Sequence, residues 1–319
     1  MRVLLTGGSG MLGGAIRRLA PDVAPGVALL APSRADLDLT DRAAVAGWYA
    51  ANPVDAVIHA AARVGGIQAN IDDPAGFMLH NLRMNDAVIA GAAAAGVPRL
   101  VFLGSSCMYP RDHRQPLVEE DVLAAPLEPT NEGYALAKIT GARLCDYLSR
   151  QHGLAYRTLI PPNLFGTGDH FGSAASHLLA AAITKVVAAQ AAGGDEVEIW
   201  GSGTARREFL DADHLARFVL TALPGLDRLP PVLNVGAEVD HSVNDYYRMA
   251  AEAAGWHGRF THDLTRPEGM RAKLMSSARA CALGYAPPTE AETRAAIAAA
   301  VAACREGAET RVARGRGAT

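Results

Sequence analysis

The 319-residue sequence has little of several features that assign a chain to a class at once. Its formal net charge is only −3, whereas a general nucleic-acid binder normally carries a basic face, so no nucleic-acid partner is expected. Its four cysteines include no CxxC pair, which argues against a disulfide framework or a metal site and favours a reducing cytoplasm. No apolar run reaches the roughly 20 residues that span a bilayer, so no membrane partner is expected either.

What the chain does have is a regular alternation of apolar runs and helical patterns. Half of its residues are apolar and a fifth are charged, which suits one or two compact domains. The apolar runs of the first half predict buried strands over residues 3–6, 27–31, 56–60, 100–104 and 156–161. The intervening patterns predict helices over residues 11–19, 42–51, 75–95 and 133–152. Continuous apolar strands separated by helices predict an α/β fold, a Rossmann-type doubly wound parallel sheet covered on both faces.

The second half of the sequence is less regular. A Gly-rich stretch over 166–173 precedes a helical pattern near 177–191, a strand pattern over 196–200, and further short elements. We expect residues 1–165 to form a Rossmann domain, a fold that commonly binds a dinucleotide, with segments near 205–240 returning to it. Residues 166–319 should mainly form a smaller, discontinuous substrate-binding lobe.

A glycine-rich turn follows the first predicted strand and opens the first helix. Its glycines are spaced GxxGxxG, and glycine allows both the tight turn and the close approach of backbone to a dinucleotide pyrophosphate. The cofactor-binding residues expected in this turn are Gly7, Ser9, Gly10, Met11, Leu12 and Gly13.

The end of the second predicted strand bears on the choice of cofactor. An NAD enzyme usually places an acidic residue there for the ribose 2′-hydroxyl, whereas a nearby arginine accommodates a 2′-phosphate. This chain has Ser33 and Arg34 at that point, with Asp36 two residues on. The pattern favours NADP(H), with Arg34 as its 2′-phosphate contact, although Asp36 leaves NAD open.

Tyr134 and Lys138 carry the clearest chemical signal. Four residues apart on a helix, they share one face, and a lysine ammonium near a phenol favours its ionisation near neutral pH. The chain has only three lysines, so a chance Tyr-x-x-x-Lys pair would be uncommon. Ser105 ends the fourth predicted strand, at the sheet edge where open α/β folds bind ligands. The Ser-Tyr-Lys set, in this order and spacing, resembles the extended short-chain dehydrogenases.

Longer motifs make the resemblance more specific. GSSCMYP at 104–110 is similar to the GSSCIYP signature of the GDP-L-fucose synthase family, whose members are epimerase–reductases. The likeness extends over roughly residues 1–220. It includes AAARVGGI at 60–67, EPTNEGYALAK at 128–138, PNLFG at 162–166 and WGSGTARREF at 200–209.

The resemblance implies roles for residues that composition and spacing leave undecided. Cys107 and His177 would be the acid and base of epimerisation. The implied nucleotide-sugar contacts are Lys185, Trp200, Arg207 and Lys273. The implied cofactor contacts, besides Lys138 and the glycine-rich turn, are Pro161, Asn163, Leu164 and His177. By the same likeness, the protein would be a homodimer.

The implied activity is NADPH-dependent 3,5-epimerisation and 4-reduction of a GDP-4-keto-6-deoxyhexose. The last third departs from the family, with Ser276 where an acid is expected, so a related GDP-sugar such as a heptose stays open. Three further functions stay open as well: a 4-ketoreductase that performs fewer epimerisations, an NAD-dependent nucleotide-sugar 4-epimerase, and a noncatalytic NADP-binding regulator.

Overall fold

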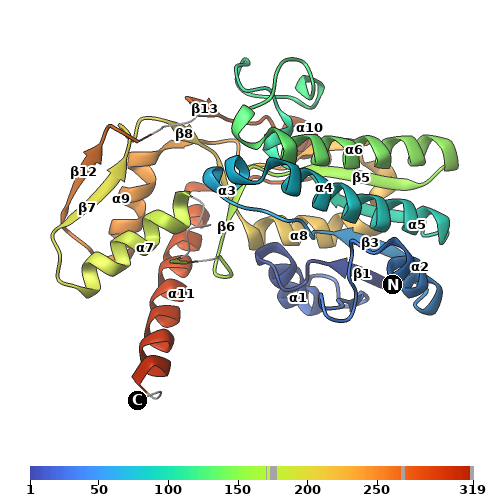
Figure 1. The fold of residues 1–319 in the computed structure, drawn as a ribbon, viewed down its shortest axis with the longest axis horizontal. Helices are drawn as coiled ribbons and strands as arrows, with labels where there is room; N and C mark the ends of the chain where they lie inside the picture. The colour runs from blue at the N-terminus through green and yellow to red at the C-terminus, as the bar shows by residue number, and fades with distance from the viewer. Residues whose placement is uncertain (170, 173–177, 267–269, 317–319) are drawn as a thin grey trace.

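The computed structural model describes residues 1–169, 171–172, 178–266 and 270–316, and a six-stranded parallel sheet dominates it (Figure 1). The strand order is β10-β5-β4-β3-β1-β2, with every neighbouring pair parallel. The six strands are β1 (Arg2–Thr6), β2 (Ala28–Leu30), β3 (Ala56–His59), β4 (Arg99–Leu103), β5 (Ala155–Ile160) and β10 (Val232–Asn234). This arrangement confirms the predicted Rossmann-type α/β fold.

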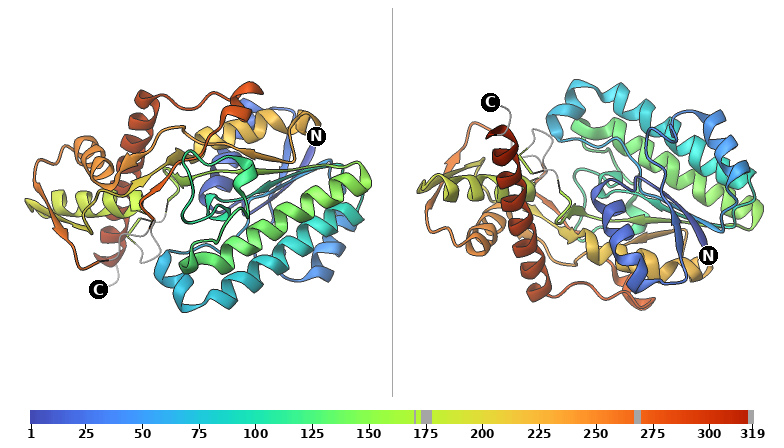
Figure 2. Two further views of the ribbon diagram at one scale, coloured as in Figure 1. Left: turned by 90° about the horizontal axis from the view of Figure 1, so that it is seen from above. Right: turned by 90° about the horizontal axis from the view of Figure 1, so that it is seen from below.

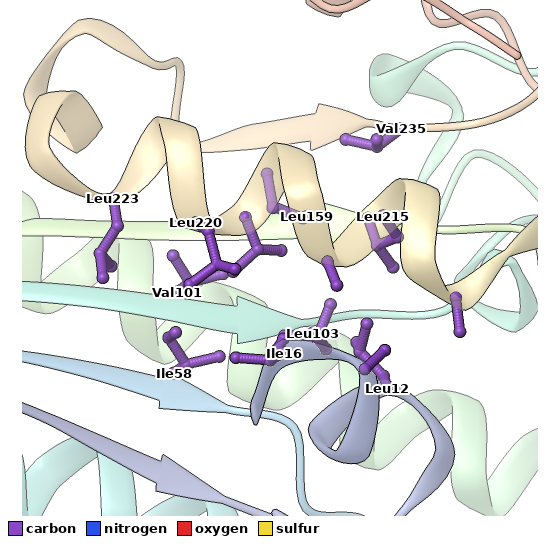
Figure 3. Packing of buried hydrophobic residues seen from close by; sticks show 14 of the residues in the cluster. Leu12, Ile16, Ile58, Val101, Leu103, Leu159, Leu215, Leu220, Leu223 and Val235 are labelled. Carbon is purple, nitrogen blue, oxygen red and sulfur yellow. The ribbon is translucent and has the colours of Figure 1, made fainter. Parts of the chain in front are cut away.

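Two helices, α1 (Met11–Val23) and α8 (Ala212–Ala222), pack together on one face of the sheet. Leu12 and Ile16 of α1 recur at helical spacing, and α8 contributes Leu215 and Leu220 to the same apolar cluster. Figure 3 shows these side chains meeting Val101 and other sheet residues in one cluster. Because α8 and β10 both belong to this half, the chain returns to the large sheet late in the sequence.

The opposite face is covered by α2 (Arg42–Ala51), α4 (Pro74–Asn85), α5 (Gly91–Ala94) and α6 (Glu132–His152). The sequence predicted one helix over 75–95, but a π-helical turn, η1 (Asp86–Ala90), interrupts it. There the Tyr49 hydroxyl donates to the Val88 carbonyl at 3.1 Å, and the Tyr49 ring lies against Gly91. Insertion of a side chain into the helical hydrogen-bond ladder is a common cause of such irregularity.

A smaller lobe lies beside the large sheet (Figure 2). Its separate apolar core is formed by α7 (Leu178–Ala191), α9 (Val243–Ala254), α11 (Glu290–Arg316) and β7 (Glu196–Trp200). Strand β12 (Arg259–Asp263) pairs with β7. Ser242 and Asp245 form a capping box at the start of α9, and Gly255, at φ 64°, ends that helix.

Short strands that the sequence did not predict connect the two halves. They are β6 (Asn163–Phe165), β8 (Arg206–Arg207), β9 (Phe209–Asp211), β11 (His241–Ser242) and β13 (Ala272–Lys273). Strand β6 follows β5 almost directly and pairs with β9. Between β8 and β9, the buried Glu208 carboxylate accepts backbone N–H groups from Ala237, Glu238 and Met275. These bonds hold three distant segments together.

Two further helices, α3 (Ile67–Asp72) and α10 (Ala278–Ala282), complete the larger elements. Over the part of the chain that the structure describes, no helix combines the length and apolar character needed to cross a membrane.

Candidate active site

The glycine-rich turn connects β1 to α1 at the carboxyl edge of the sheet. Gly7 has φ 72°, and a Cβ at Gly13 would lie 2.0 Å from the Gly7 carbonyl oxygen, so neither position has room for a side chain. The N-cap residue of α1 is Gly10, which has no side chain to accept the first backbone N–H groups of the helix. These N–H groups are therefore available to a ligand. Ser9, Met11 and Leu12 lie in the same turn. A backbone cradle at the start of a 13-residue helix fits a dinucleotide pyrophosphate.

Arg34 lies just beyond β2, at the same edge of the sheet, and its side chain is exposed. Nearby Asp36 accepts hydrogen bonds from both the backbone N–H and the hydroxyl of Ser33, at 2.9 and 2.6 Å. These bonds hold the pKa of Asp36 below its usual value, so it stays a carboxylate. Asp36 thus closes its own turn, while the Arg34 guanidinium faces solvent.

Ser105 and Cys107 follow β4 at the centre of this edge. Ser105 Oγ accepts the backbone N–H of Cys107 at 3.2 Å and so caps a short 3-10 helix, η2 (Ser106–Met108). The Ser106 N–H donates to the Pro161 carbonyl at 3.1 Å. The pairing of β4 with β5 therefore continues past the strand ends and places Pro161 beside the serine segment.

Tyr134 and Lys138 stand on the first turns of α6, as the sequence predicted. Lys138 is buried, and its Nζ donates to the Leu103 carbonyl at 2.7 Å and lies 5.8 Å from the Tyr134 ring centroid. Burial lowers the pKa of Lys138 to about 8, although the nearby Cys107 acts in the opposite direction. Ser105, Cys107, Tyr134 and Lys138 thus form one cluster.

The expected ionisation of Tyr134 near neutral pH is not what this cluster favours. Burial raises the pKa of the phenol above its usual value, the charge of Cys107 acts the same way, and a hydrogen bond with Ser105 only partly offsets them. Tyr134 is therefore held as a neutral phenol, which is the form that can donate a proton.

A buried network of hydrogen bonds lies next to this cluster. The His59 ring lies 2.7 Å from Thr6 Oγ1 through Nδ1 and 3.2 Å from Asn85 Oδ1 through Nε2. Asn85 Nδ2 in turn donates to the Ala137 carbonyl at 2.9 Å, next to Lys138. These bonds connect β1, which leads into the glycine-rich turn, with β3, α4 and α6.

We predict that His59 makes the protein less stable in mild acid. Burial, and then the charge of Lys138, lower its pKa to about 3. The unfolded chain instead takes up a proton below the ordinary pKa of about 6.5. His59 therefore contributes stability that is present above pH 6.5 and lost as the pH falls toward 3. Between about pH 7.5 and 5 it should remove about 2 kcal/mol from the free energy of unfolding.

Urea unfolding of His59→Gln at several pH values checks this expectation. The substitution removes the titrating ring, so that part of the pH dependence should disappear, whatever the absolute stability of the variant. The control His257→Gln, at an exposed histidine, should keep the wild-type slope. An unchanged slope in His59→Gln would show that the ring is not the titrating group.

In the smaller lobe, an exposed tryptophan gathers two cations. Trp200, 55% exposed, ends β7, and Lys185 Nζ lies 5.3 Å from its ring centroid. Lys185 also donates to the Glu198 carbonyl at 2.7 Å. The structure adds Arg266, whose guanidinium carbon is 4.8 Å from the same ring centroid. No sequence motif points to Arg266, because it lies beyond residues 1–220, which carry the motifs of the family.

Arg207 and Lys273 lie on neighbouring strands. They are directly paired across the parallel strands β8 and β13. Burial lowers the pKa of Arg207, while Glu128, which lies just before α6, acts in the opposite direction. The structure therefore brings the two predicted substrate contacts together, and Arg207 interacts electrostatically with the segment that leads into α6.

Three sequence-predicted residues remain. Asn163 and Leu164 lie on β6, where the chain leaves the large sheet for the smaller lobe. His177 falls outside the described residues, so its predicted role stays a prediction. Within the described ranges, no group of three or more His, Cys, Asp or Glu side chains is arranged to hold a metal ion.

Comparison with known proteins identifies the family. Residues 3–236 match the NAD dependent epimerase/dehydratase family. The chain is 43% identical over 291 residues to a GDP-L-fucose synthase of Azorhizobium caulinodans, covering 91% of this chain and 93% of that protein. It is 40% identical to a GDP-L-colitose synthase of Yersinia pseudotuberculosis, covering 92% and 95%.

A solved structure agrees with these relatives. A GDP-mannoheptose C4 reductase from Campylobacter jejuni with NADP bound is 26% identical, with a TM-score of 0.85, over 95% of this chain and 98% of that one. The Rossmann-type fold, the cluster around Tyr134 and the sequence similarity therefore all point to one family. The chain belongs to the NAD dependent epimerase/dehydratase family and, within it, to the GDP-L-fucose synthase family.

Proposed function

We propose that the protein catalyses NADPH-dependent 3,5-epimerisation and 4-reduction of a GDP-4-keto-6-deoxyhexose, converting GDP-4-keto-6-deoxymannose to GDP-L-fucose. The observation that supports this most is the meeting of four side chains at the carboxyl edge of the sheet. Ser105 bonds to Tyr134, and Lys138 lies one helical turn further on. The charge of Cys107 acts on both Tyr134 and Lys138. The cluster thus combines a proton donor for a ketone oxygen with a thiol.

NADP(H) is the cofactor of this proposal. The cradle around Gly7 and Gly13 fits its pyrophosphate, and Lys138, Pro161 and β6 lie near the edge where the nicotinamide would bind. Because Asp36 is bonded to Ser33, the exposed Arg34 is the group available to meet a 2′-phosphate. A similar enzyme has been solved with NADP bound.

Arg34 should therefore set the preference for NADPH over NADH. Its guanidinium can make charge-assisted hydrogen bonds to the 2′-phosphate, so Arg34→Ala should weaken NADPH about ten- to a hundredfold and leave NADH nearly unchanged. Titration of both nucleotides by fluorescence measures the two Kd values. Arg42→Ala, at an exposed arginine of α2, is the matched control. Equal weakening of both nucleotides would mean that Arg34 does not read the 2′-phosphate.

In the reduction step, bound NADPH supplies the hydride that C4 receives. Tyr134, held neutral by burial, donates its proton to O4. Ser105 donates a second hydrogen bond to the same oxygen and stabilises the negative charge that develops there. Lys138 lies one turn away and stabilises the phenolate that remains.

The epimerisation step uses the ketone in another way. A C4 carbonyl acidifies the protons on both C3 and C5, so a single enolate-forming site can invert the two centres. We assign Cys107 and His177 to opposite faces of the sugar, where one removes a proton and the other delivers one. Ser105 and Tyr134 stabilise the enolate oxygen.

The nucleotide diphosphate would bind across the smaller lobe. Lys185 and Arg207 supply the positive charge, with the guanidinium able to bind in bidentate fashion. Trp200 offers an exposed ring for stacking, and Lys273 extends the cationic surface beside Arg207.

Product analysis tests the assignment. Purified protein is given GDP-4-keto-6-deoxymannose with NADPH or NADH, and the product is identified by NMR. We expect one NADPH oxidised per sugar reduced and GDP-L-fucose as product. A transient use of NAD without net oxidation would instead indicate a 4-epimerase, and no turnover with any keto-sugar would leave a noncatalytic NADP-binding protein.

One further candidate has support of its own. The structural similarity to a GDP-mannoheptose C4 reductase favours a C4 reductase that leaves C3 and C5 unchanged, or one that takes a GDP-heptose. The same NMR experiment separates it, because its product would keep the configuration of the substrate at C3 and C5.

We propose residues 1–165 as the NADP-binding domain, with segments near 205–240 returning to it, and 166–319 mainly as the substrate-binding lobe. The return of the chain to the first domain is supported by β10, which is an edge strand of the large sheet, and by α8, which packs with α1 on one face of that sheet. The lobe is supported by the separate core around α7 and α9.

We also propose a homodimer in the cytoplasm. Helices α4 and α6 pack together and present the exposed apolar side chains of Leu79 and Tyr147, a surface that a second copy could cover. The four cysteines, all within the described ranges, form no disulfide with one another, which suits a reducing compartment.

A further inference from the structure

Asn131 occupies the N-cap position of α6, three residues before Tyr134, yet its side chain does not cap the helix. Asparagine is among the best residues for that task, and an N-cap amide normally accepts a backbone N–H of the first turn. Here Asn131 Nδ2 instead donates to Cys107 Sγ at 3.1 Å. The side chain therefore reaches across to η2 and contacts the sulfur.

The other end of the same amide is unused. Asn131 Oδ1 is buried and has no hydrogen-bond partner among the described residues. A buried acceptor without a partner costs folding free energy, so such atoms are uncommon in proteins and often mark a site for a ligand or an ordered water. This acceptor belongs to the side chain that holds the sulfur, at the edge where the sugar would bind.

We propose that Asn131 positions Cys107 for proton transfer and binds the substrate at the same time. Its N–H group favours the thiolate and fixes the direction of the sulfur, while Oδ1 accepts a hydrogen bond from a hydroxyl of the sugar. The inference rests on the proposed epimerase function and adds a residue to it.

Three other residues also interact with Cys107, and they have to be separated from the effect of Asn131. Tyr134 and Lys138 on α6 both interact with the charge of Cys107, and Ser105 Oγ accepts its backbone N–H. All three remain when Asn131 is replaced. A change in the acidity of the thiol on replacing Asn131 therefore reports the loss of its N–H donor.

The first measurement needs no substrate. The rate at which iodoacetamide alkylates Cys107 is followed against pH by mass spectrometry of the peptide that contains it. Since a hydrogen bond to a charged group is a strong one, its midpoint should rise by about one to two pH units in Asn131→Ala. In Asn131→Asp it should rise at least as far, because a carboxylate replaces the donor. The control Asn52→Ala, at the end of α2, should keep the wild-type midpoint.

The second measurement separates the two ends of the amide. Deuterium wash-in at C3 and C5 of GDP-4-keto-6-deoxymannose should be slowed in both variants. The KM of the sugar should rise about tenfold in Asn131→Ala and much less in Asn131→Asp, which keeps an acceptor oxygen at that position. Circular dichroism and NADPH binding check the folding of both variants, which should match the wild-type protein in each.

The outcomes distinguish this inference from the function beneath it. If the wild-type protein neither exchanges deuterium nor oxidises NADPH with keto-sugars, the proposed function fails, while the alkylation profile still judges the contact between Asn131 and Cys107. An unchanged alkylation midpoint in both folded variants would overturn the positioning role. An unchanged KM in Asn131→Ala would overturn the sugar contact.

Discussion

Replacing Tyr134 with phenylalanine should reduce the rate of ketone reduction by about 10²–10⁴-fold, because it removes the proton donor to O4. The ring stays in place, so the packing of α6 and the binding of NADPH should persist. Single-turnover oxidation of NADPH in the presence of GDP-4-keto-6-deoxymannose measures the step directly. Nucleotide binding is measured separately by fluorescence.

Tyr147→Phe is the matched control, since Tyr147 lies on the same helix and is 49% exposed. It should reduce the ketone at the wild-type rate. Near-normal turnover by Tyr134→Phe would remove Tyr134 from the proposed chemistry. Loss of NADPH binding in that variant would point to a structural role instead.

Replacing Cys107 with serine should slow the wash-in of solvent deuterium at C3 and C5 by about 10²–10⁴-fold. A thiol is far more acidic than an alcohol, so serine is a poor substitute for proton transfer near neutral pH. The variant should stay folded and bind NADPH, because Cys107 is only partly buried and serine is slightly smaller. NMR of the keto-sugar in D₂O with NADP⁺ or no cofactor measures exchange without reduction.

Cys281→Ser, at a partly buried cysteine of α10, should exchange deuterium at the wild-type rate. His177→Asn should also impair exchange, with a different balance between C3 and C5 if the two groups face opposite sides of the ring. Wild-type exchange in both Cys107→Ser and His177→Asn would make the protein a 4-ketoreductase that carries the family's cysteine and histidine without using them.

The Rossmann half could be predicted because its signals are local. Strand β3 is buried along its whole length, so its sequence is a nearly continuous apolar run, and the glycines after β1 are required by the backbone itself. The spacing of Tyr134 and Lys138 likewise determines that they share one face of α6. The π-helical turn at Asp86–Ala90 could not be predicted in this way, because the helical pattern of the sequence runs over it without a break.

The connections between the two halves could not be predicted from such patterns. Strands β8 and β13 have two residues each, too few to show an alternation, and they form where the Glu208 carboxylate accepts backbone N–H groups from two distant segments, 237–238 and 275. The position of Arg266 over Trp200 depends on another long-range pairing, that of β12 with β7, which sets Asp263 opposite Trp200, and Arg266 donates to the Asp263 carboxylate at 3.1 Å. For Asn131 the motif was visible, but its bond to the Cys107 sulfur depends on how η2 and α6 meet.

One reaction tests the central proposal most directly: complete conversion of GDP-4-keto-6-deoxymannose with unlabelled NADPH in D₂O, followed by NMR of the product. If epimerisation precedes reduction at this site, the product is GDP-L-fucose with deuterium at C3 and C5 and protium at C4, and one NADPH is oxidised for each sugar. Protium retained at C3 and C5, with reduction at C4 intact, would contradict the epimerase half. A sugar converted without oxidation of NADPH would contradict the reductase half.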